Sequence, residues 1–261
     1  MKKKILIPCF LLMGTLTACN DGLVTKGVPF KEANITAIDE SIKNEKKGSI
    51  KKVTIESDVE TVLDVKVAGE KVSATGNATT TAKIDLIEMT VELSTKIVSK
   101  SGKTEIKKEG SMKVKKENNT LRTISSSGDT SSFNNIDFDN YFTGDVDGCY
   151  SWNFTIGDDV IEQVANDSNV STSTAKEITT KISDKLMVDG DTAKGTFDVG
   201  IKEEVPLSIN GTTTKYTKLK YSFKDALLQS YIIGIYASSS NSTTSAATTV
   251  TAKNSYSYEF K

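Results

Sequence analysis

Apolar residues recur at every second position in the first third of the chain, and this period constrains the fold more than any other feature. Between residues 53 and 67, the alternating set is Val53, Ile55, Val59, Thr61, Leu63, Val65 and Val67, apolar except for Thr61, with mostly charged or polar residues between them. A two-residue period gives a β-strand one apolar and one polar face. Gly69-Glu70-Lys71 interrupts the pattern, which resumes over residues 72–86, so we predict a long antiparallel hairpin.

The apolar phase slips by one residue after Leu86 and continues at Met89 and Val91. A slip of this kind indicates either a β-bulge near Ile87-Glu88 or a break between two strands. A second turn is predicted at residues 99–103. Further strands are predicted at residues 104–108, 112–116, 121–124, 150–156, 197–201, 217–223, 231–236 and 250–260.

Two regions have helical patterns. After Pro29, which suits a first helical turn, Ile35, Ile38 and Ile42 fall on one helix face. The second region is a helical insert at about residues 158–187, where Asp158 and Ser173 can each cap a helix, the second one carrying Ala175, Ile178, Ile182 and Leu186. Helices interspersed with many strands predict that they pack on the sheet.

Two polar segments are predicted as loops. Residues 125–148 are rich in Asp and Asn, and residues 237–249 are a low-complexity run of Ser, Thr and Ala. The predicted fold class is therefore α+β and β-dominated. It is a long, curved, half-barrel-like antiparallel sheet with an N-terminal helix and a helical insert packed on it.

The first nineteen residues resemble a bacterial lipoprotein signal. Lys2 to Lys4 precede an apolar run too short to span a bilayer, and the run ends in the lipobox-like Leu16-Thr17-Ala18-Cys19. The resemblance implies cleavage before Cys19, thioether attachment of a diacylglycerol and acylation of the new N-terminus. The expected divisions are a signal peptide at 1–18, a lipidated tether at 19–29 and a single β-rich domain at 30–261.

This anchor places the chain in the cell envelope, on the outer face of the plasma membrane or at the outer membrane. Asn20 after the cysteine is not the retention residue Asp of enteric bacteria, so outer-membrane delivery is compatible with the sequence. Residues 1–18 carry three lysines and no acids, so their removal takes the formal charge from −1 to −4. That balance argues against a nucleic-acid partner.

The chain has no histidine, which excludes Ser-His-Asp triads, Cys-His nucleophiles and His-ligated zinc. Cys9 is removed with the signal peptide and Cys19 is lipidated, so Cys149 is the single thiol left. No intramolecular disulfide is therefore expected. We expect no catalytic residues and no cofactor, although a hydrolase built on paired carboxylates stays open as a third hypothesis.

Asn135, Asp137 and Asp139 have the one-apart spacing of calcium ligands, and Asp145 and Asp147 follow. An EF-hand loop requires Gly and Glu where this chain has Asn140 and Val146. These residues are weak calcium candidates, and the alternative is a solvated loop in which Asp and Asn accept bonds from backbone amides.

The order of a helix, long bent strands, a helical insert and more strands resembles the LolA/LppX superfamily of envelope lipoproteins. The resemblance is carried by the Ile35-Ile38-Ile42 helix, the strands at 53–67 and 72–86 with their Gly69-Glu70-Lys71 turn, and the strand at 150–156. It implies a half-closed sheet whose apolar concave face can hold acyl chains. No ligand-binding residue is carried over.

The leading hypothesis is a non-enzymatic, membrane-anchored envelope lipoprotein that binds or carries a lipid or another apolar ligand. The alternative is a surface-exposed structural or interaction lipoprotein without a small-molecule ligand, which meets its partner through residues 125–148 and 237–249. The pattern of strand residues does not distinguish a filled interior from a ligand cavity.

Overall fold

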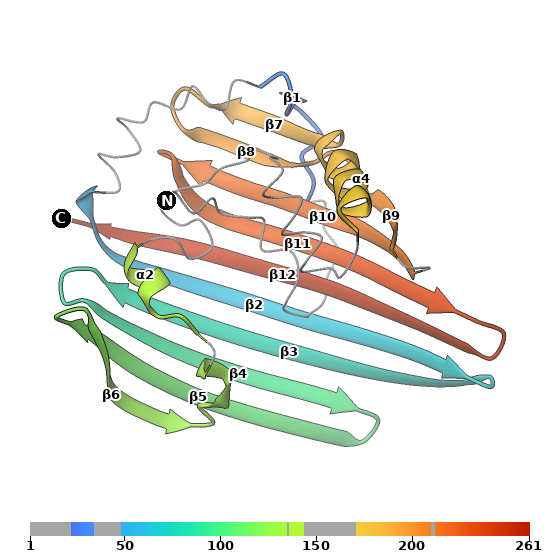
Figure 1. Cartoon of the computed structure of the whole chain (residues 1–261), viewed down its shortest axis with the longest axis horizontal. Coiled ribbons are helices and arrows are strands. Elements are labelled where there is room, and N and C mark those ends of the chain that lie inside the picture. Colours follow the sequence, from blue (N-terminus) through green and yellow to red (C-terminus); the bar gives the residue numbers. More distant parts are fainter. Residues whose placement is uncertain (1–21, 34–47, 135, 144–170, 210–211) are drawn as a thin grey trace.

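The computed structural model of the chain describes residues 22–33, 48–134, 136–143, 171–209 and 212–261. The described strands form one open, antiparallel sheet in the order β1-β7-β8-β10-β11-β12-β2-β3-β4-β5-β6, with β9 paired to β10 (Figure 1). The predicted β-dominated fold class is confirmed. The strands are β1 (Val28–Pro29), β2 (Ile50–Val67), β3 (Glu70–Asp85), β4 (Thr90–Ser101), β5 (Thr104–Glu117), β6 (Thr120–Gly128), β7 (Leu186–Asp191), β8 (Thr196–Ile201), β9 (Val205–Ile209), β10 (Thr212–Lys224), β11 (Leu227–Ser240) and β12 (Thr244–Phe260).

The centre of the sheet is the pairing of β12 with β2, which joins the last strand of the chain to the first long one. The register runs from Thr244 opposite Val67 to Phe260 opposite Ile50. Because directly opposed residues share a face, the alternation predicted for β2 fixes the orientation of β12 and, through it, of the C-terminal strands. We call the face that carries Val53 the inner face and the opposite one the outer face.

Three hairpins close with two-residue turns in which both residues have positive φ. They are Ala68-Gly69, Asn118-Asn119 and Asp225-Ala226. This geometry is the type I′ turn, whose twist matches that of the flanking strands. The predicted hairpin between residues 53 and 86 is confirmed, with Gly69 at φ +93° in its turn.

The phase slip near Ile87 is a strand break, one of the two predicted alternatives. β3 ends at Asp85, and Asp85 Oδ1 accepts hydrogen bonds from the backbone N–H groups of Ile87 and Glu88, each at 2.9 Å. β4 then begins at Thr90. The intervening residues turn the chain, so the apolar set resumes one position out of phase.

One hydrophobic core spans the inner face. It joins Val53, Ile84 and Leu93 of the first hairpins to Val199, Leu219 and other residues of the C-terminal strands. The described helices lie on one side of the sheet, with α2 (Asp139–Thr143) over the first strands and α4 (Thr172–Ser183) over β8 to β10 (Figure 1). Helix α4 contributes Ala175, Ile178 and Ile182 as its buried residues, as its apolar spacing predicted.

The prediction of a loop at residues 237–249 is wrong. β11 continues to Ser240 and β12 begins at Thr244, so residues 241–243 alone turn the chain. Asn241 Oδ1 accepts bonds from the backbone N–H groups of Thr243 at 3.0 Å and Thr244 at 2.8 Å. The segment is polar because most of its side chains are only partly buried at this end of the sheet, and its threonines suit strands.

The described part of the loop predicted at residues 125–148, namely 125–134 and 136–143, contains regular secondary structure. β6 continues to Gly128, and a 3₁₀ turn (Ser131–Phe133) and helix α2 follow. The two strands predicted at 104–108 and 112–116 are one strand, β5. Gly110 lies between the two predicted strands. A Cβ at this position would lie 2.0 Å from the carbonyl oxygen of Asp129, so the close approach of the two backbones requires glycine.

The cap of α4 differs from the prediction. Ser171, not Ser173, is the N-cap, since its Oγ accepts a bond from the backbone N–H of Thr174 at 3.2 Å. The helix ends at Ser183, and Leu186 begins β7 instead of completing the apolar helix face. Leu186 and Val188 alternate with exposed or half-buried residues, as expected for a strand with one buried face.

Several predictions lie outside the described residues. These are the signal peptide, Cys19, the helix with Ile35, Ile38 and Ile42, Cys149, the strand at 150–156 and the helix capped by Asp158. Within the described ranges, no helix combines the length and the apolar character needed to cross a membrane.

Candidate functional site

A row of polar side chains crosses the apolar inner face at right angles to the strands. Cross-strand pairing aligns its members, which are Tyr231, Asn254, Ser57, Thr80 and Thr95. We call these five residues the polar row. Thr80 Oγ1 and Thr95 Oγ1 are hydrogen-bonded at 3.3 Å. The row therefore places hydroxyl and amide groups between largely apolar rows of the inner face.

Asn254 is the buried centre of the polar row. Its exposed fraction is 6%, and within the described residues its side-chain Oδ1 accepts no hydrogen bond. A buried acceptor left without a donor costs about 1–3 kcal/mol, and native cores hold few such atoms. An oxygen of this kind favours any bound molecule that brings an N–H or O–H donor to it.

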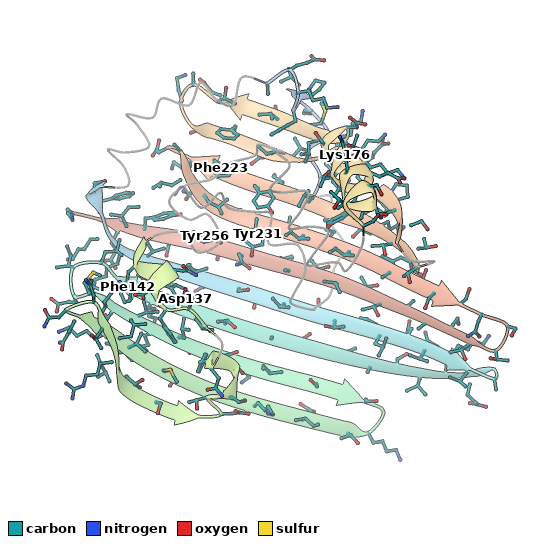
Figure 2. The ribbon with its side chains drawn as sticks, viewed as in Figure 1. Asp137, Phe142, Lys176, Phe223, Tyr231 and Tyr256 are labelled. Carbon is teal, nitrogen blue, oxygen red and sulfur yellow. The ribbon has the colours of Figure 1, made fainter. Side chains whose placement is uncertain are left out.

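A cluster of tyrosines surrounds this amide. The Tyr231 ring lies 5.4 Å from the Tyr221 ring and 6.4 Å from the Tyr256 ring, centroid to centroid. Figure 2 shows Tyr231 and Tyr256 side by side in the middle of the sheet. Tyrosines combine a large apolar surface with a hydroxyl, so this cluster suits a ligand that is apolar along most of its length and polar at one end.

Apolar rows flank the polar row on both sides. Towards the N-terminal end of β2, Ile55 lies opposite Tyr256 and Ala82, and Ala82 lies opposite Leu93. On the other side, Val59 lies opposite Ala252, and Ala252 lies opposite Ile233. Along β2, the inner face therefore carries an apolar row at Ile55, the polar row at Ser57 and a second apolar row at Val59.

Exposed apolar residues recur on the inner face at the hairpin tips, at or beyond a row that holds Thr61, Gly76 and Ser99. Leu63, Val67, Val72 and Ile106 are 37%, 52%, 59% and 56% exposed, and Val65, opposite Val72, is half-buried. We call these five residues the apolar tip. Leu63 lies six residues beyond Ser57, which is about 20 Å along an extended strand. A group of exposed apolar side chains of this kind is typical of binding sites.

The described calcium candidates have other partners. Asp139 Oδ1 lies 2.7 Å from the Nζ of Lys116, and Asp137 Oδ1 accepts a 3.1 Å bond from the backbone N–H of Asp139. Asn135 lies outside the described residues. Within those residues, no group of three or more His, Cys, Asp or Glu side chains is placed to hold a metal ion.

Sequence reasoning missed Asn254, although a signal for it is present. Ala252, Tyr256 and Tyr258 occupy the inward positions of β12, and Asn254 takes the position between Ala252 and Tyr256. A polar residue in phase with an apolar face is the pattern of either a satisfied core amide or a binding group. The sequence does not show whether hydrogen-bond partners surround it, so the pattern alone does not separate the two.

A scan against protein-family models finds no match, and no curated protein matches the chain. Among solved structures, it is similar to the S-type phycobiliprotein lyase CPES from Guillardia theta at 8% identity and a TM-score of 0.18, over 85% of this chain and 98% of that one. It is also similar to a DUF1329 family protein from Desulfovibrio piger at 10% identity and a TM-score of 0.13, over 88% and 92%. TM-scores this low are no argument for a common fold or function.

Proposed function

We propose that the chain is a membrane-anchored envelope lipoprotein that binds an amphiphilic lipid on the inner face of its sheet. The headgroup lies on the polar row and the hydrocarbon lies along the strands towards the apolar tip. The protein is not an enzyme in this proposal and requires no cofactor or metal. The observation that carries the proposal is the buried Oδ1 of Asn254 within an apolar face, which has no hydrogen-bond donor among the residues that the structure describes.

The chemistry of the row indicates which headgroups fit. Asn254 Oδ1 is an acceptor, so it selects a hydroxyl or amide hydrogen, and a fully ionised carboxylate offers none. The hydroxyls of Ser57 and Thr80 lie in the same row and can donate or accept. A neutral lipid with free hydroxyl groups, such as a monoacylglycerol, is therefore the class we favour.

The apolar tip supports a bound hydrocarbon chain rather than a compact apolar molecule. Val65 and Val72 are opposed across β2 and β3, and Leu63 lies two residues before Val65 on the same face. Removing apolar surface from water contributes about 25 cal/mol for each Å². A chain that covers this surface gains that contribution, whereas a small compact ligand at the polar row does not reach it.

The anchor rests on the lipobox-like segment that ends at Cys19. Two or three acyl chains hold a protein at a membrane firmly, where one chain does not. Lipids would then be available at the surface to which the protein is attached. The resemblance to the LolA/LppX superfamily supports the same function.

The proposal is tested with a soluble form that begins at Asn20. Its native mass spectrum is recorded before and after organic extraction, and uptake of a fluorescent monoacylglycerol by the extracted protein is then titrated. We expect an extractable, stoichiometric lipid mass and saturable uptake. The Asn254→Leu variant, which keeps the branching of the Asn side chain but is bulkier and cannot hydrogen-bond, is expected to bind about tenfold more weakly, as the loss of one hydrogen bond implies. A clean mass without extraction and no uptake would contradict the proposal.

A further inference from the structure

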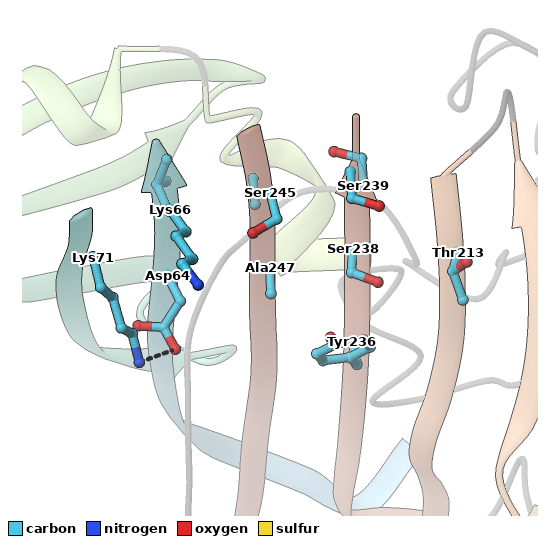
Figure 3. Close-up of a pocket in the computed structure, with 12 residues that line it drawn as sticks. Asp64, Lys66, Lys71, Thr213, Tyr236, Ser238, Ser239, Ser245 and Ala247 are labelled. Carbon is cyan, nitrogen blue, oxygen red and sulfur yellow. Dashed lines mark ion pairs between the residues drawn. The ribbon is translucent and has the colours of Figure 1, made fainter. Parts of the chain in front are cut away.

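The outer face carries a depression at the far end of the long strands, and its chemistry differs from that of the polar row. It has a volume of about 400 Å³ and opens to solvent between the ends of β2, β10, β11 and β12 (Figure 3). Pockets that take small molecules span about 300–1,000 Å³. Its lining is Asp64, Val65, Lys66, Lys71, Thr213, Tyr236, Ser238, Ser239, Ser240, Ser245, Ala246 and Ala247. We call it the outer groove.

Cross-strand register explains why the surface is hollow there. One row runs through Thr213, Ser238, Ala247, Asp64 and Ser73 on neighbouring strands. Ala247 is the smallest side chain of this row and lies in its middle, between Ser238 and Asp64. The larger side chains on either side form the walls, and the methyl group of Ala247 forms the floor.

The next row towards the tips supplies hydroxyls and positive charge. Ser240 lies opposite Ser245, Ser245 opposite Lys66, and Lys66 opposite Lys71. Lys71 Nζ lies 3.2 Å from Asp64 Oδ2, whereas Lys66 forms no ion pair within the described residues (Figure 3). Two lysines against one carboxylate leave the groove with a net positive charge.

Asp64 is held in its ionised form. The Ser73 hydroxyl donates to Asp64 Oδ1 at 2.5 Å, and this bond together with Lys71 lowers the pKa of Asp64 below its usual value. The carboxylate is therefore an acceptor for ligand hydroxyls at neutral pH, and Lys66 is a cation for a ligand anion. Tyr236, on the wall of the groove, adds a ring, and Lys215 Nζ lies 5.5 Å from its centroid.

We propose that the outer groove binds an anionic saccharide. Serine and threonine hydroxyls and an ionised carboxylate match a ligand rich in hydroxyl groups, and the Tyr236 ring offers a flat surface to the apolar face of a sugar ring. Lys66 selects a carboxylate or phosphate on that sugar. A nucleic-acid strand is a poorer fit, because such sites combine a basic channel with several stacking rings, and this groove has one ring and small net charge.

This site is distinct from the polar row, which lies on the inner face, although Val65 belongs to the apolar tip and also lines the outer groove. The test uses the full chain and titrates it with trigalacturonate at low ionic strength, with maltotriose as the neutral comparison. We expect trigalacturonate to bind and maltotriose to bind at least about tenfold more weakly. Asn254→Leu is expected to leave this binding unchanged, so failure of one site is distinguishable from failure of the other.

Two variants locate the binding. Lys66→Gln removes the unpaired charge and is expected to weaken binding about fivefold, and Ala247→Val fills the floor and is expected to weaken it about tenfold without lowering the unfolding midpoint. Lys103→Gln is the matched control, because Lys103 is exposed in the β4–β5 turn outside the groove. No binding at millimolar trigalacturonate, equal binding of maltotriose, or an equal loss in Lys103→Gln would overturn the proposal. Tighter binding of oligo-dT, sensitive to Lys66→Gln, would overturn it in favour of nucleic acid.

Discussion

Asn254 of β12 and Tyr231 of β11 are direct cross-strand partners on the inner face. A buried amide oxygen with no hydrogen-bond donor among the described residues therefore lies beside a ring packed between two other tyrosines. The amide weakens the core at this point. Its presence there is more simply explained by a bound donor than by packing, because an apolar residue would pack there without the desolvation cost.

The first prediction is that Asn254→Leu raises stability. The substitution removes a buried, unpartnered acceptor, so the free energy of unfolding in the absence of lipid should rise by about 1 kcal/mol. Urea denaturation followed by circular dichroism measures it. Tyr231→Leu is the comparison, since it removes a packed ring and should lower stability by more than 1 kcal/mol, roughly as large core truncations do. A loss of stability in Asn254→Leu would assign Asn254 a structural role.

The second prediction concerns the apolar tip. Val72→Asp places a charge on an exposed apolar position and should weaken monoacylglycerol binding while changing the free energy of unfolding by less than about 0.5 kcal/mol. Val72 is 59% exposed, so little burial is lost. Thr75→Asp is the matched control, because Thr75 is an exposed residue of the same strand on the outer face. Equal effects of the two variants on binding would contradict a lipid lying on the inner face.

The strand pattern predicted the centre of the sheet well, for a physical reason. In β2 and β3 the two-residue period coincides with burial at Val53, Ile55 and Ile84, so local sequence and tertiary packing agree. Strands were predicted within β11 and β12, but their ends at residues 237–249 were predicted as a loop, because this tip is largely solvent-accessible on both faces. Ser239 and Thr244 there carry no apolar signal, and strand formation depends on pairing with β2, which local sequence does not report.

The third prediction concerns the type I′ turn of the first hairpin. Ala68 has φ +49°, a conformation in which Cβ crowds the backbone, whereas asparagine tolerates it and Asn-Gly is a preferred pair in this turn. Ala68→Asn should therefore raise the free energy of unfolding by about 0.5–1 kcal/mol, measured by urea denaturation. Ala74→Asn, at a strand position of the same hairpin, should not stabilise. Destabilisation by Ala68→Asn would mean that the turn is of another type.

The fourth prediction concerns Asp85 and pH. The backbone N–H of Glu88, then that of Ile87 and the nearby Lys52 ammonium, lower the pKa of Asp85 below its usual 3.8. A carboxylate whose pKa is lower in the folded state than in the unfolded state stabilises the protein at pH values above its unfolded-state pKa. This stabilisation is lost as the pH falls through the folded-state pKa. Asp85→Asn keeps an acceptor for both amides, so its unfolding free energy should fall less steeply than that of the unsubstituted chain between about pH 5 and pH 2.

Asp85→Ala removes the acceptor and should lower the free energy of unfolding at neutral pH by about 1 kcal/mol. Parallel pH profiles of the two variants, obtained by urea denaturation, separate the charge from the hydrogen bonds. A profile of Asp85→Asn as steep as that of the unsubstituted chain would show that other carboxylates carry the acid sensitivity.

The candidate site was harder to predict than the sheet. The polar row needs five residues from five strands in one register, and only the pairing of β12 with β2 brings Asn254 next to Ser57. About three quarters of the chain separates these two residues, and no periodic pattern encodes a contact of that kind. The sequence indicated an apolar inner face, but not the polar group inside it.

The most direct test of the proposed function is to determine on which residues a bound lipid lies. A monoacylglycerol with a diazirine on its hydrocarbon chain is bound to the soluble form and photolysed, and labelled residues are located by peptide mass spectrometry. The account predicts labels on inner-face positions such as Val65, Val72 and Tyr231, competed by unlabelled lipid and reduced in Asn254→Leu. Labels distributed equally over outer-face residues such as Thr75 and Thr79, or no competable label, would contradict it.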